Sequence, residues 1–438
     1  MKIKYVFLSS IVLLSSLINS CGVCSLDFYV QKEPIYLPLE NISKDIKFTS
    51  VRKFNDLGKI YTYKDYIFIN ENNFGVHVID NKNPKNPEKI GFIKIPFNED
   101  IAIKNNILYA DILNEIVSID ISNIKNVKVI ERIKLDDYNY NSLKFNINPS
   151  KGILIGNKRI KKYSRDCQNN FINIFGMMPS TTSNPIPQSA DISNSTGKGG
   201  SLARFALVND YLYTVSTSNL NLFDTKDPNK IITYGSVSID NGRRDIETIF
   251  AYKDKLFMGS RTGAYIYDNS NPQQPTFITK VEHTRSCDPV VVENDKAYVT
   301  LKGDNTCRGG NNQLDIIDLS DIKNSKIIKS YNMDNPSGLA IKDNNLFICD
   351  LNKLKIFDVK DSMNIKEISS ILINRPNDII LNENNQGVIV SKEGLYQYDF
   401  SGLPDKKDFQ KLSFIPTEKD KYFNGDVEFI YSGDNEYY

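Results

Sequence analysis

Aspartate recurs at one position of a repeated motif, and it is the first candidate for chemistry in this 438-residue sequence. Each copy ends an apolar run and precedes a polar turn, as in VHVID before NKNP. A carboxylate can act as a general acid or base. At the first position of a turn it can instead accept a hydrogen bond from the backbone N–H two residues on. Because one copy occurs in each repeat, we expect the turn role for Asp80, Asp120, Asp224, Asp268, Asp318, Asp358 and Asp399.

A second set of polar residues opens the first strand that we expect in each repeat. If those strands line a central channel, the set forms a ring at one mouth. The ring could bind a small anion, a sugar or a cation with oxygen ligands. Alternatively, its charged groups pair with one another and with turn N–H groups, and this structural role is the one that we expect. The candidate channel-mouth residues are Asp100, Arg244, Asp245, Arg285, Asp288, Arg375 and Asp378, with Asn141 and Ser337 at equivalent positions.

Residues for metal or nucleophilic catalysis are scarce in this sequence. The two histidines, His77 and His283, lie in different repeats, and neither belongs to an HExxH frame. We therefore expect no zinc site and no Ser/His/Asp triad. His77 is expected to be an ordinary, outward-facing strand residue. No attachment motif for a redox cofactor is present, so we expect neither a metal nor a cofactor.

Two of the six cysteines occupy positions that suit a disulfide bond. Cys287 begins a first strand and Cys307 follows the second strand of the same repeat, and antiparallel pairing brings such positions together. A bond there would stabilise an exported fold by roughly 3 kcal/mol in the chain-entropy model. Metal binding by the two thiols is the weaker alternative. Cys349, inside NLFICD, is expected to be a buried, small hydrophobic residue, and Cys167 has no assigned role.

The elements that must position these residues are short strands in a repeat. Each repeat has an apolar strand, a polar turn, a second strand, a third strand that ends at the marker aspartate, and a fourth strand. Four strands in roughly forty residues are typical of a β-propeller blade, whose sheet is buried only when neighbours stack on it. We therefore predict an all-β fold, a β-propeller of about eight four-stranded blades, with seven as the alternative count.

The third repeat differs from the others. Residues Leu143 to Ser164 match Ile380 to Ser401 in their apolar pattern, but Ser164 replaces the marker aspartate. An insertion rich in Ser, Thr, Asn, Pro and Gly follows at 165–199, and we expect it to project from the disc as a partner-binding or irregular loop. The expected domains are a signal peptide at 1–20, an anchor and linker at 21–45, the propeller at 46–416 and an acidic, aromatic tail at 417–438.

The N-terminus carries a targeting signal. Lys2 and Lys4 precede an apolar run too short to span a membrane, and the run ends in LINSC. This resembles the lipobox of bacterial lipoprotein precursors, which implies cleavage before Cys21 and lipid attachment to it; an ordinary secretory signal is the alternative. With 54 basic and 53 acidic residues, no net field favours nucleic acid.

Three segments carry a resemblance to a known family. GVHVIDNKNPKNPEKIGFIKIP, NILYADILNEIVSIDISNI and CDPVVVENDKAYVTLKGDNTC resemble the LVIVD-repeat proteins, from about Lys59 to Pro416. These are β-propellers of bacterial and archaeal surfaces, and the closest likeness is to lipoproteins of Bacteroidetes-like bacteria. The resemblance implies a location in the cell envelope, as a surface-exposed lipoprotein of the outer membrane. It implies no catalytic residues.

The expected function is therefore non-enzymatic. We expect a lipid-anchored interaction module whose partner is an envelope protein or extracellular glycan. The alternative is a carbohydrate-binding or glycan-processing propeller with a polar site at the channel mouth. Glycosidase chemistry would need two carboxyl groups facing a pocket, about 5–10 Å apart. Paired, satisfied carboxylates would favour the interaction module.

Overall fold

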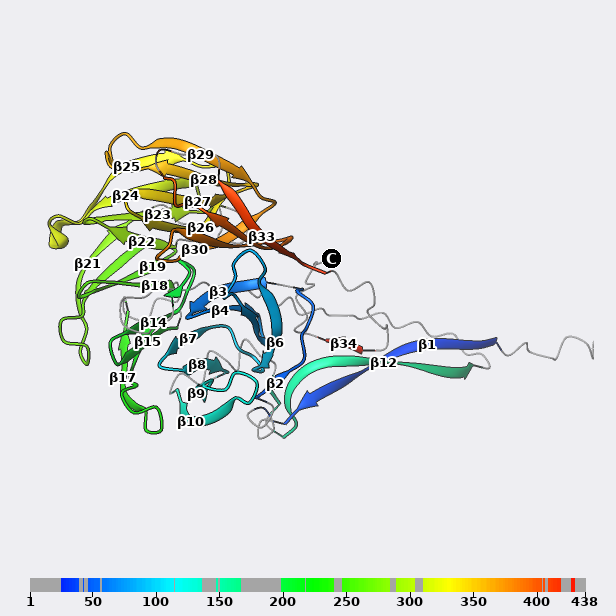
Figure 1. Cartoon of the computed structure of the whole chain (residues 1–438). Coiled ribbons are helices and arrows are strands. Elements are labelled where there is room, and N and C mark those ends of the chain that lie inside the picture. Colours follow the sequence, from blue (N-terminus) through cyan, green and yellow to red (C-terminus); the bar gives the residue numbers. More distant parts are fainter. Residues whose placement is uncertain are drawn as a thin grey trace, which may run out of the picture. The chain divides into compact units, whose positions relative to one another are not determined.

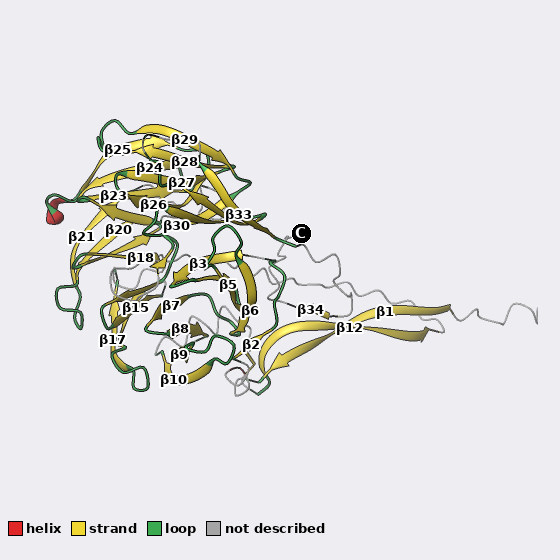
Figure 2. Cartoon of the chain, viewed as in Figure 1, coloured by secondary structure: helices red, strands yellow, loops and turns green. Residues whose placement is uncertain are grey.

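The computed structural model describes residues 25–38, 42, 46–55, 57–113, 115–135, 147–148, 150–166, 198–216, 218–239, 246–283, 289–303, 310–403, 405, 409–418 and 427–429. Strands and turns make up nearly all of this, and η4 (Ile322–Asn324) is a single turn of 3-10 helix (Figure 2). The chain divides into a smaller unit and a larger one. No helix within the described ranges has the length and apolar character needed to cross a lipid bilayer.

The smaller unit is a sheet of two long strands and two short ones. Its elements are β1 (Ser25–Leu37), β11 (Ile147–Asn148), β12 (Gly152–Asp166) and β34 (Val427–Phe429). β1 runs antiparallel to β12, from the pair Ser25 and Asp166 to the pair Leu37 and Ile153. Strand β1 therefore lies where we expected a linker, and β34 lies in the expected tail.

The repeat from Leu143 to Ser164 is consequently not a propeller blade. Its described residues begin with the short β11 and β12 pair, as a blade would. β12 does not turn back and is 15 residues long in all. In the last repeat the second strand turns back after Ser391, and the third strand begins at Gly394. Counted from Gly152 and Gly387, the equivalent residue is Arg159, which instead remains in β12 and pairs with Lys32 of β1.

The larger unit contains seven antiparallel sheets within the described residues, each built on four consecutive strands, and two further strands make the first of them six-stranded (Figure 1). The first three are β3 (Leu57–Tyr63), β4 (Tyr66–Glu71), β5 (Gly75–Asp80) and β6 (Glu88–Lys94); β7 (Ile101–Lys104), β8 (Ile107–Ile112), β9 (Glu115–Asp120) and β10 (Lys128–Lys134); and β14 (Phe205–Val208), β15 (Tyr211–Val215), β16 (Asn219–Asp224) and β17 (Ile232–Ser238).

The other four sheets repeat this order. They are β18 (Ile246–Tyr252), β19 (Lys255–Ser260), β20 (Gly263–Asp268) and β21 (Thr276–Glu282); β22 (Val290–Glu293), β23 (Lys296–Leu301), β24 (Gln313–Asp318) and β25 (Lys326–Asn332); β26 (Pro336–Lys342), β27 (Asn345–Asp350), β28 (Lys353–Asp358) and β29 (Lys366–Leu372); and β30 (Pro376–Leu381), β31 (Gln386–Ser391), β32 (Gly394–Asp399) and β33 (Gln410–Pro416).

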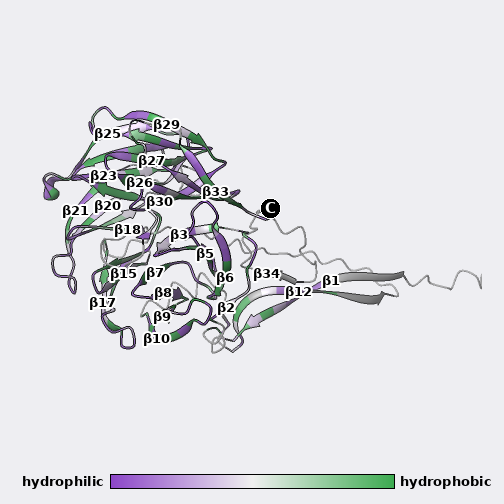
Figure 3. Cartoon of the chain, viewed as in Figure 1, coloured by the Kyte–Doolittle hydropathy of each residue, from purple (hydrophilic) through white to green (hydrophobic). Residues whose placement is uncertain are grey.

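These sheets are blades arranged around an axis. The first strand of each blade contacts the first strands of both neighbours, and β3 touches both β7 and β30, which closes the ring. Apolar side chains fill the spaces between blades. One cluster joins Ile60 and Ile69 of the first blade to Val388 and Val390 of the last. Hydrophilic and hydrophobic residues are mixed along the outer strands, such as β29, where one face meets water (Figure 3).

Two short strands extend the first blade beyond four. β2 (Lys47–Thr49) pairs with β6 on the outside, and β13 (Lys198–Gly199) pairs with β3 on the inside. Each blade is otherwise made from one continuous stretch of chain. The first blade therefore gains β2 from the chain that precedes it and β13 from the chain that follows the second blade. β13 lies on the inner side of the blade, toward the axis.

Marker aspartates act as turn acceptors in all seven blades. In each, Oδ1 accepts a hydrogen bond from the backbone N–H two residues on, at 2.8 to 3.1 Å. The N–H of Ser122 holds the pKa of Asp120 below its ordinary value, and that of Ser270 does the same for Asp268. The predicted turn role is confirmed, because each of these bonds joins the aspartate at the start of a turn to a backbone N–H within that turn.

Candidate functional site at the propeller axis

Residues 198–204, here called the channel segment, lie at the axis of the ring. The segment begins as β13 against β3, where Gly200 N–H donates to Ile60 O at 3.3 Å. Further on, Ile249 N–H of β18 donates to Ala203 O at 3.0 Å. The segment also bonds residues of β26 and β30 and the entry to β7. Because these strands surround the axis, a segment that reaches all of them must occupy the channel.

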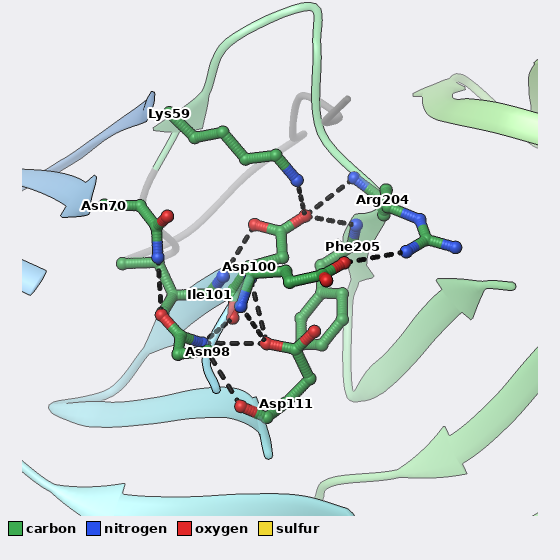
Figure 4. A network of polar contacts seen from close by, with 9 residues as sticks. Lys59, Asn70, Asn98, Asp100, Ile101, Asp111, Arg204 and Phe205 are labelled. Carbon is green, nitrogen blue, oxygen red and sulfur yellow. Dashed lines mark hydrogen bonds and ion pairs between the residues drawn. The ribbon is translucent and has the colours of Figure 1, made fainter. Parts of the chain in front are cut away.

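The first acidic side chain that holds the channel segment is Asp100 (Figure 4). Its Oδ2 accepts the N–H groups of Arg204 at 2.7 Å and Phe205 at 3.1 Å. Its Oδ1 accepts the N–H of Ile101 at 2.6 Å, and Lys59 Nζ lies 3.6 Å from Oδ2. Asp100 and Lys59 are 1% and 5% exposed, so this ion pair joins the first two blades to the segment without contact with solvent.

Burial strongly changes the protonation of this pair. It lowers the pKa of Lys59 to about 8 and raises the pKa of Asp100 to about 6, because both charged forms lose hydration. Each partner opposes the shift of the other. A buried pair of this kind specifies geometry more than it adds stability, since desolvation offsets much of the Coulomb attraction.

A second carboxylate supports the loop that carries Asp100. Asp111 Oδ1 accepts the N–H groups of Glu99 at 2.8 Å and Asp100 at 2.9 Å. The Asn98 amide donates to the same oxygen at 2.8 Å and accepts from Asn70 Nδ2 at 2.5 Å (Figure 4). Burial raises the pKa of Asp111 to about 6. The two carboxylates therefore face backbone donors, and the loop between the first two blades is fixed.

On the other side of the axis, Asp378 holds the beginning of the channel segment. Its Oδ1 accepts the Ser201 hydroxyl at 3.1 Å and the Ile379 N–H at 2.9 Å. Ser201 Oγ accepts Leu339 N–H at 2.9 Å, which links the segment to β26. Asp378 is 0% exposed, and burial raises its pKa to about 7. The carboxyl group therefore sits among backbone and hydroxyl donors.

Two glycines make this close approach possible. A Cβ atom on Gly200 would lie 1.8 Å from Asp378 Oδ2, and one on Gly338 would lie 2.2 Å from Asp378 Oδ1. Neither distance is compatible with a side chain. The Asp378 carboxyl is thus enclosed between the backbones of the channel segment and β26.

The predicted channel-mouth ring is described only in part. Arg244, Asp245, Arg285, Asp288 and Asn141 lie outside the described residues, as do Cys21, Cys287, Cys307 and most of the insertion. Ser337 Oγ donates to Asn377 Oδ1 at 3.2 Å. Arg375 is exposed, and no ion pair among the described residues joins it to the buried Asp378. Asp100 and Asp378 contact the channel segment, a partner that the sequence pattern did not indicate.

His77 is buried, so the expectation that it faces outward is wrong. Its Nε2 lies 2.8 Å from Glu71 Oε2, and the rings of Phe54 and Phe92 meet it edge on, with centroids 4.9 Å away. Arg52 Nη2 pairs with Glu71 Oε1 at 2.9 Å. Burial lowers the pKa of His77. His77 is buried because the stretch that carries Arg52 and Phe54, which follows β2, covers this part of the first blade.

Cys349 matches its prediction. It is a free, fully buried thiol in the cluster between the sixth and seventh blades. Across the part of the chain that the structure describes, no three His, Cys, Asp or Glu side chains gather in a way that could hold a metal ion. The polar groups at the axis are instead arranged around backbone donors.

Seven radially stacked four-stranded sheets with their first strands at the axis define a β-propeller, and solved structures agree. The periplasmic gluconolactonase of Pseudomonas aeruginosa superposes with a TM-score of 0.52 and 10% identity, covering 85% of this chain and 98% of that one. A protein from Lactobacillus plantarum gives 0.53 and 11%, covering 85% and 99%. At these identities the similarity shows the fold alone. No protein-family model and no curated protein matches the chain.

Proposed function

We propose that this protein is a lipid-anchored β-propeller of the bacterial cell envelope that binds another envelope protein or an extracellular glycan without catalysis. The observation that carries the proposal is the occupancy of the axis. Asp100 and Asp378, the acidic residues most suited to a ligand in the channel, bind the channel segment of the same chain. Because the channel segment fills the centre of the ring, we expect a partner to bind the outer surfaces and loops of the propeller.

The resemblance to LVIVD-repeat proteins supports the envelope location. The same family likeness favours a surface-exposed lipoprotein of the outer membrane, anchored at Cys21. The carbohydrate-processing alternative has less support. Glycosidases direct two carboxyl groups at a sugar, whereas Asp100 and Asp378 direct theirs at N–H and hydroxyl groups of the protein itself.

Partner binding is expected to depend on residues 167–197, the interior of the insertion. In intact cells treated with a crosslinker, a pull-down of the full-length protein should recover specific partners. Replacing residues 167–197 with a scrambled segment of equal length and composition should remove them. The replacement must leave residues 198–204 unchanged, because these fill the channel.

The matched control for that experiment scrambles the outer turn at 361–364, between β28 and β29, which should leave partner recovery unchanged. Recovery of the same partners from the variant with the scrambled insertion would assign binding to another surface. Recovery of no crosslinked partner or glycan from wild-type cells would contradict the proposed function.

Cys21→Ser is expected to move the protein from the membrane fraction to the soluble fraction of a lysed bacterial host. Acyl chains hold a protein on a bilayer through burial of their methylene groups, at about 0.8 kcal/mol each, and serine cannot carry them by this route. Labelling with a fatty-acid analogue measures the same property, and Cys349→Ser serves as the control. Persistent membrane association of Cys21→Ser, with unchanged labelling, would refute the anchor.

A further inference from the structure

Asp378 differs from Asp100 in how its charge is compensated. Asp100 has Lys59 Nζ 3.6 Å from its carboxylate. Among the residues that the structure describes, no Lys, Arg or His forms an ion pair with Asp378. Its Oδ1 accepts hydrogen bonds from Ile379 N–H and from the Ser201 hydroxyl of the channel segment, and among the described residues its Oδ2 has no hydrogen-bond partner. The nearby backbone N–H groups of Ser201 and Leu202 also act to lower its pKa. A buried carboxylate without a cation is costly to ionise.

The groups around Asp378 give it no other charge partner. β27 contributes Cys349 and Asp350; burial keeps the pKa of the Cys349 thiol well above its usual value, and Asp350 is paired with Lys355 at 2.7 Å. β26 contributes Gly338, and Arg375, directly before β30, is exposed. Lys198 Nζ of the channel segment donates to Leu381 O at 2.9 Å. Proton gain or loss at Asp378 therefore acts directly on the segment.

We propose that Asp378 is a proton-operated latch on the channel segment: the protonated carboxyl keeps Ser201 and Leu202 seated at the axis, and ionisation loosens them. The geometry suits a latch, because the backbones at Gly200 and Gly338 approach the carboxyl closely and Asp378 is 0% exposed while the segment is seated. The latch does not depend on the proposed partner binding.

The direction of the pH effect follows from the two states. With the segment seated, burial raises the pKa of Asp378 to about 7; with the segment withdrawn, the carboxyl is hydrated and its pKa returns to its ordinary range. The seated state is therefore favoured most at pH values below the ordinary pKa of an aspartate carboxyl. That preference declines as the pH rises toward about 7 and is constant above it.

Amide hydrogen exchange on the full-length protein tests the latch. Between about pH 5 and about pH 8, protection of the Ser201 and Leu202 amides, corrected for intrinsic exchange rates, should fall about tenfold or more, since one pKa unit corresponds to a factor of ten. Asp378→Asn, which cannot ionise, should keep only the weaker pH dependence that Asp100 transmits through its bonds to the Arg204 and Phe205 amides. Asp315→Asn, at a buried carboxylate of β24 bonded to Ser330, should keep the wild-type profile.

A second variant keeps the test decisive should Asp378→Asn fail to fold. The Ser201 hydroxyl bond lowers the pKa of Asp378, so Ser201→Ala should move the loss of protection to higher pH. Flat wild-type protection would overturn the latch, as would a wild-type slope in folded Asp378→Asn. An unchanged midpoint in Ser201→Ala would also overturn it.

Discussion

Asp100→Ala is expected to destabilise the propeller by about 3–5 kcal/mol, the usual cost of removing one partner from a buried ion pair. The substitution leaves Lys59 without a buried counter-charge and removes the acceptor for the N–H groups of Arg204 and Phe205. Urea unfolding monitored by circular dichroism measures the change. The loss should be smaller above about pH 8, where the Lys59 amine is neutral.

Two control variants distinguish the effect of the unpaired Lys59 ammonium from nonspecific destabilisation. Adding Lys59→Met to Asp100→Ala removes the stranded amine and should recover part of the lost stability. Asp295→Asn removes the charge of an exposed pair with Lys253, in which both side chains are about 60% exposed, and keeps a residue type that tolerates the φ of +57° at this position, so the midpoint of unfolding should be unchanged. Equal effects of Asp100→Ala and Asp295→Asn would contradict the structural role assigned to Asp100.

Gly200→Ala is expected to destabilise the fold by about 1–3 kcal/mol or more, as overpacking of a closed interior does. The new Cβ would lie 1.8 Å from Asp378 Oδ2, so either the carboxyl or the channel segment must move. Movement of the segment would break the bond between Ser201 Oγ and Asp378 Oδ1. Denaturant unfolding gives the loss, and hydrogen exchange shows whether the amides of residues 201–204 lose protection first.

A double-mutant cycle with Asp378→Ala tests the steric explanation. If the clash dominates, the combined variant should be clearly less destabilised than the sum of its two single changes, because one substitution removes what the other collides with. Additive effects would show that Gly200 is needed for a reason other than contact with Asp378.

Much of the blade architecture could be predicted from local pattern. Period-two alternation and polar turns mark the strands, and the marker aspartates at residues such as Asp80 and Asp358 do make the expected turn bonds. These features depend on neighbours within about ten residues. A repeat shows them several times over, which makes the pattern easy to recognise.

The divergent repeat and the channel segment could not be predicted in this way. Pairing of β12 with β1 joins residues more than a hundred positions apart, and the pattern of Leu143 to Ser164 is compatible with both a blade and a long ribbon. Lys198, Gly199 and Gly200 belong to a stretch without strand periodicity. Their place at the axis depends on close backbone approach, for which the adjacent small residues Gly199, Gly200 and Ser201 are the available signal.

The burial of His77 and the pairing of Asp100 also depend on distant residues. Arg52 and Phe54 reach His77 and Glu71 from the stretch before the first blade. Lys59, one blade away, supplies the counter-charge to Asp100. The position of Asp100 at the start of a first strand was therefore enough to predict that it lies at the axis. It was not enough to predict which residues Asp100 contacts.

The contact between Ser201 and Asp378 spans 177 residues of sequence, which has a consequence for biosynthesis. A ribosome synthesises Ser201 well before the last blade. The earlier blades of the nascent chain therefore cannot close the ring until that blade has been made. Contacts of such long range form late in folding. Until Asp378 has been synthesised, the ring lacks its last blade. A product truncated before that point would have no partner for Ser201 of the channel segment on that side of the axis.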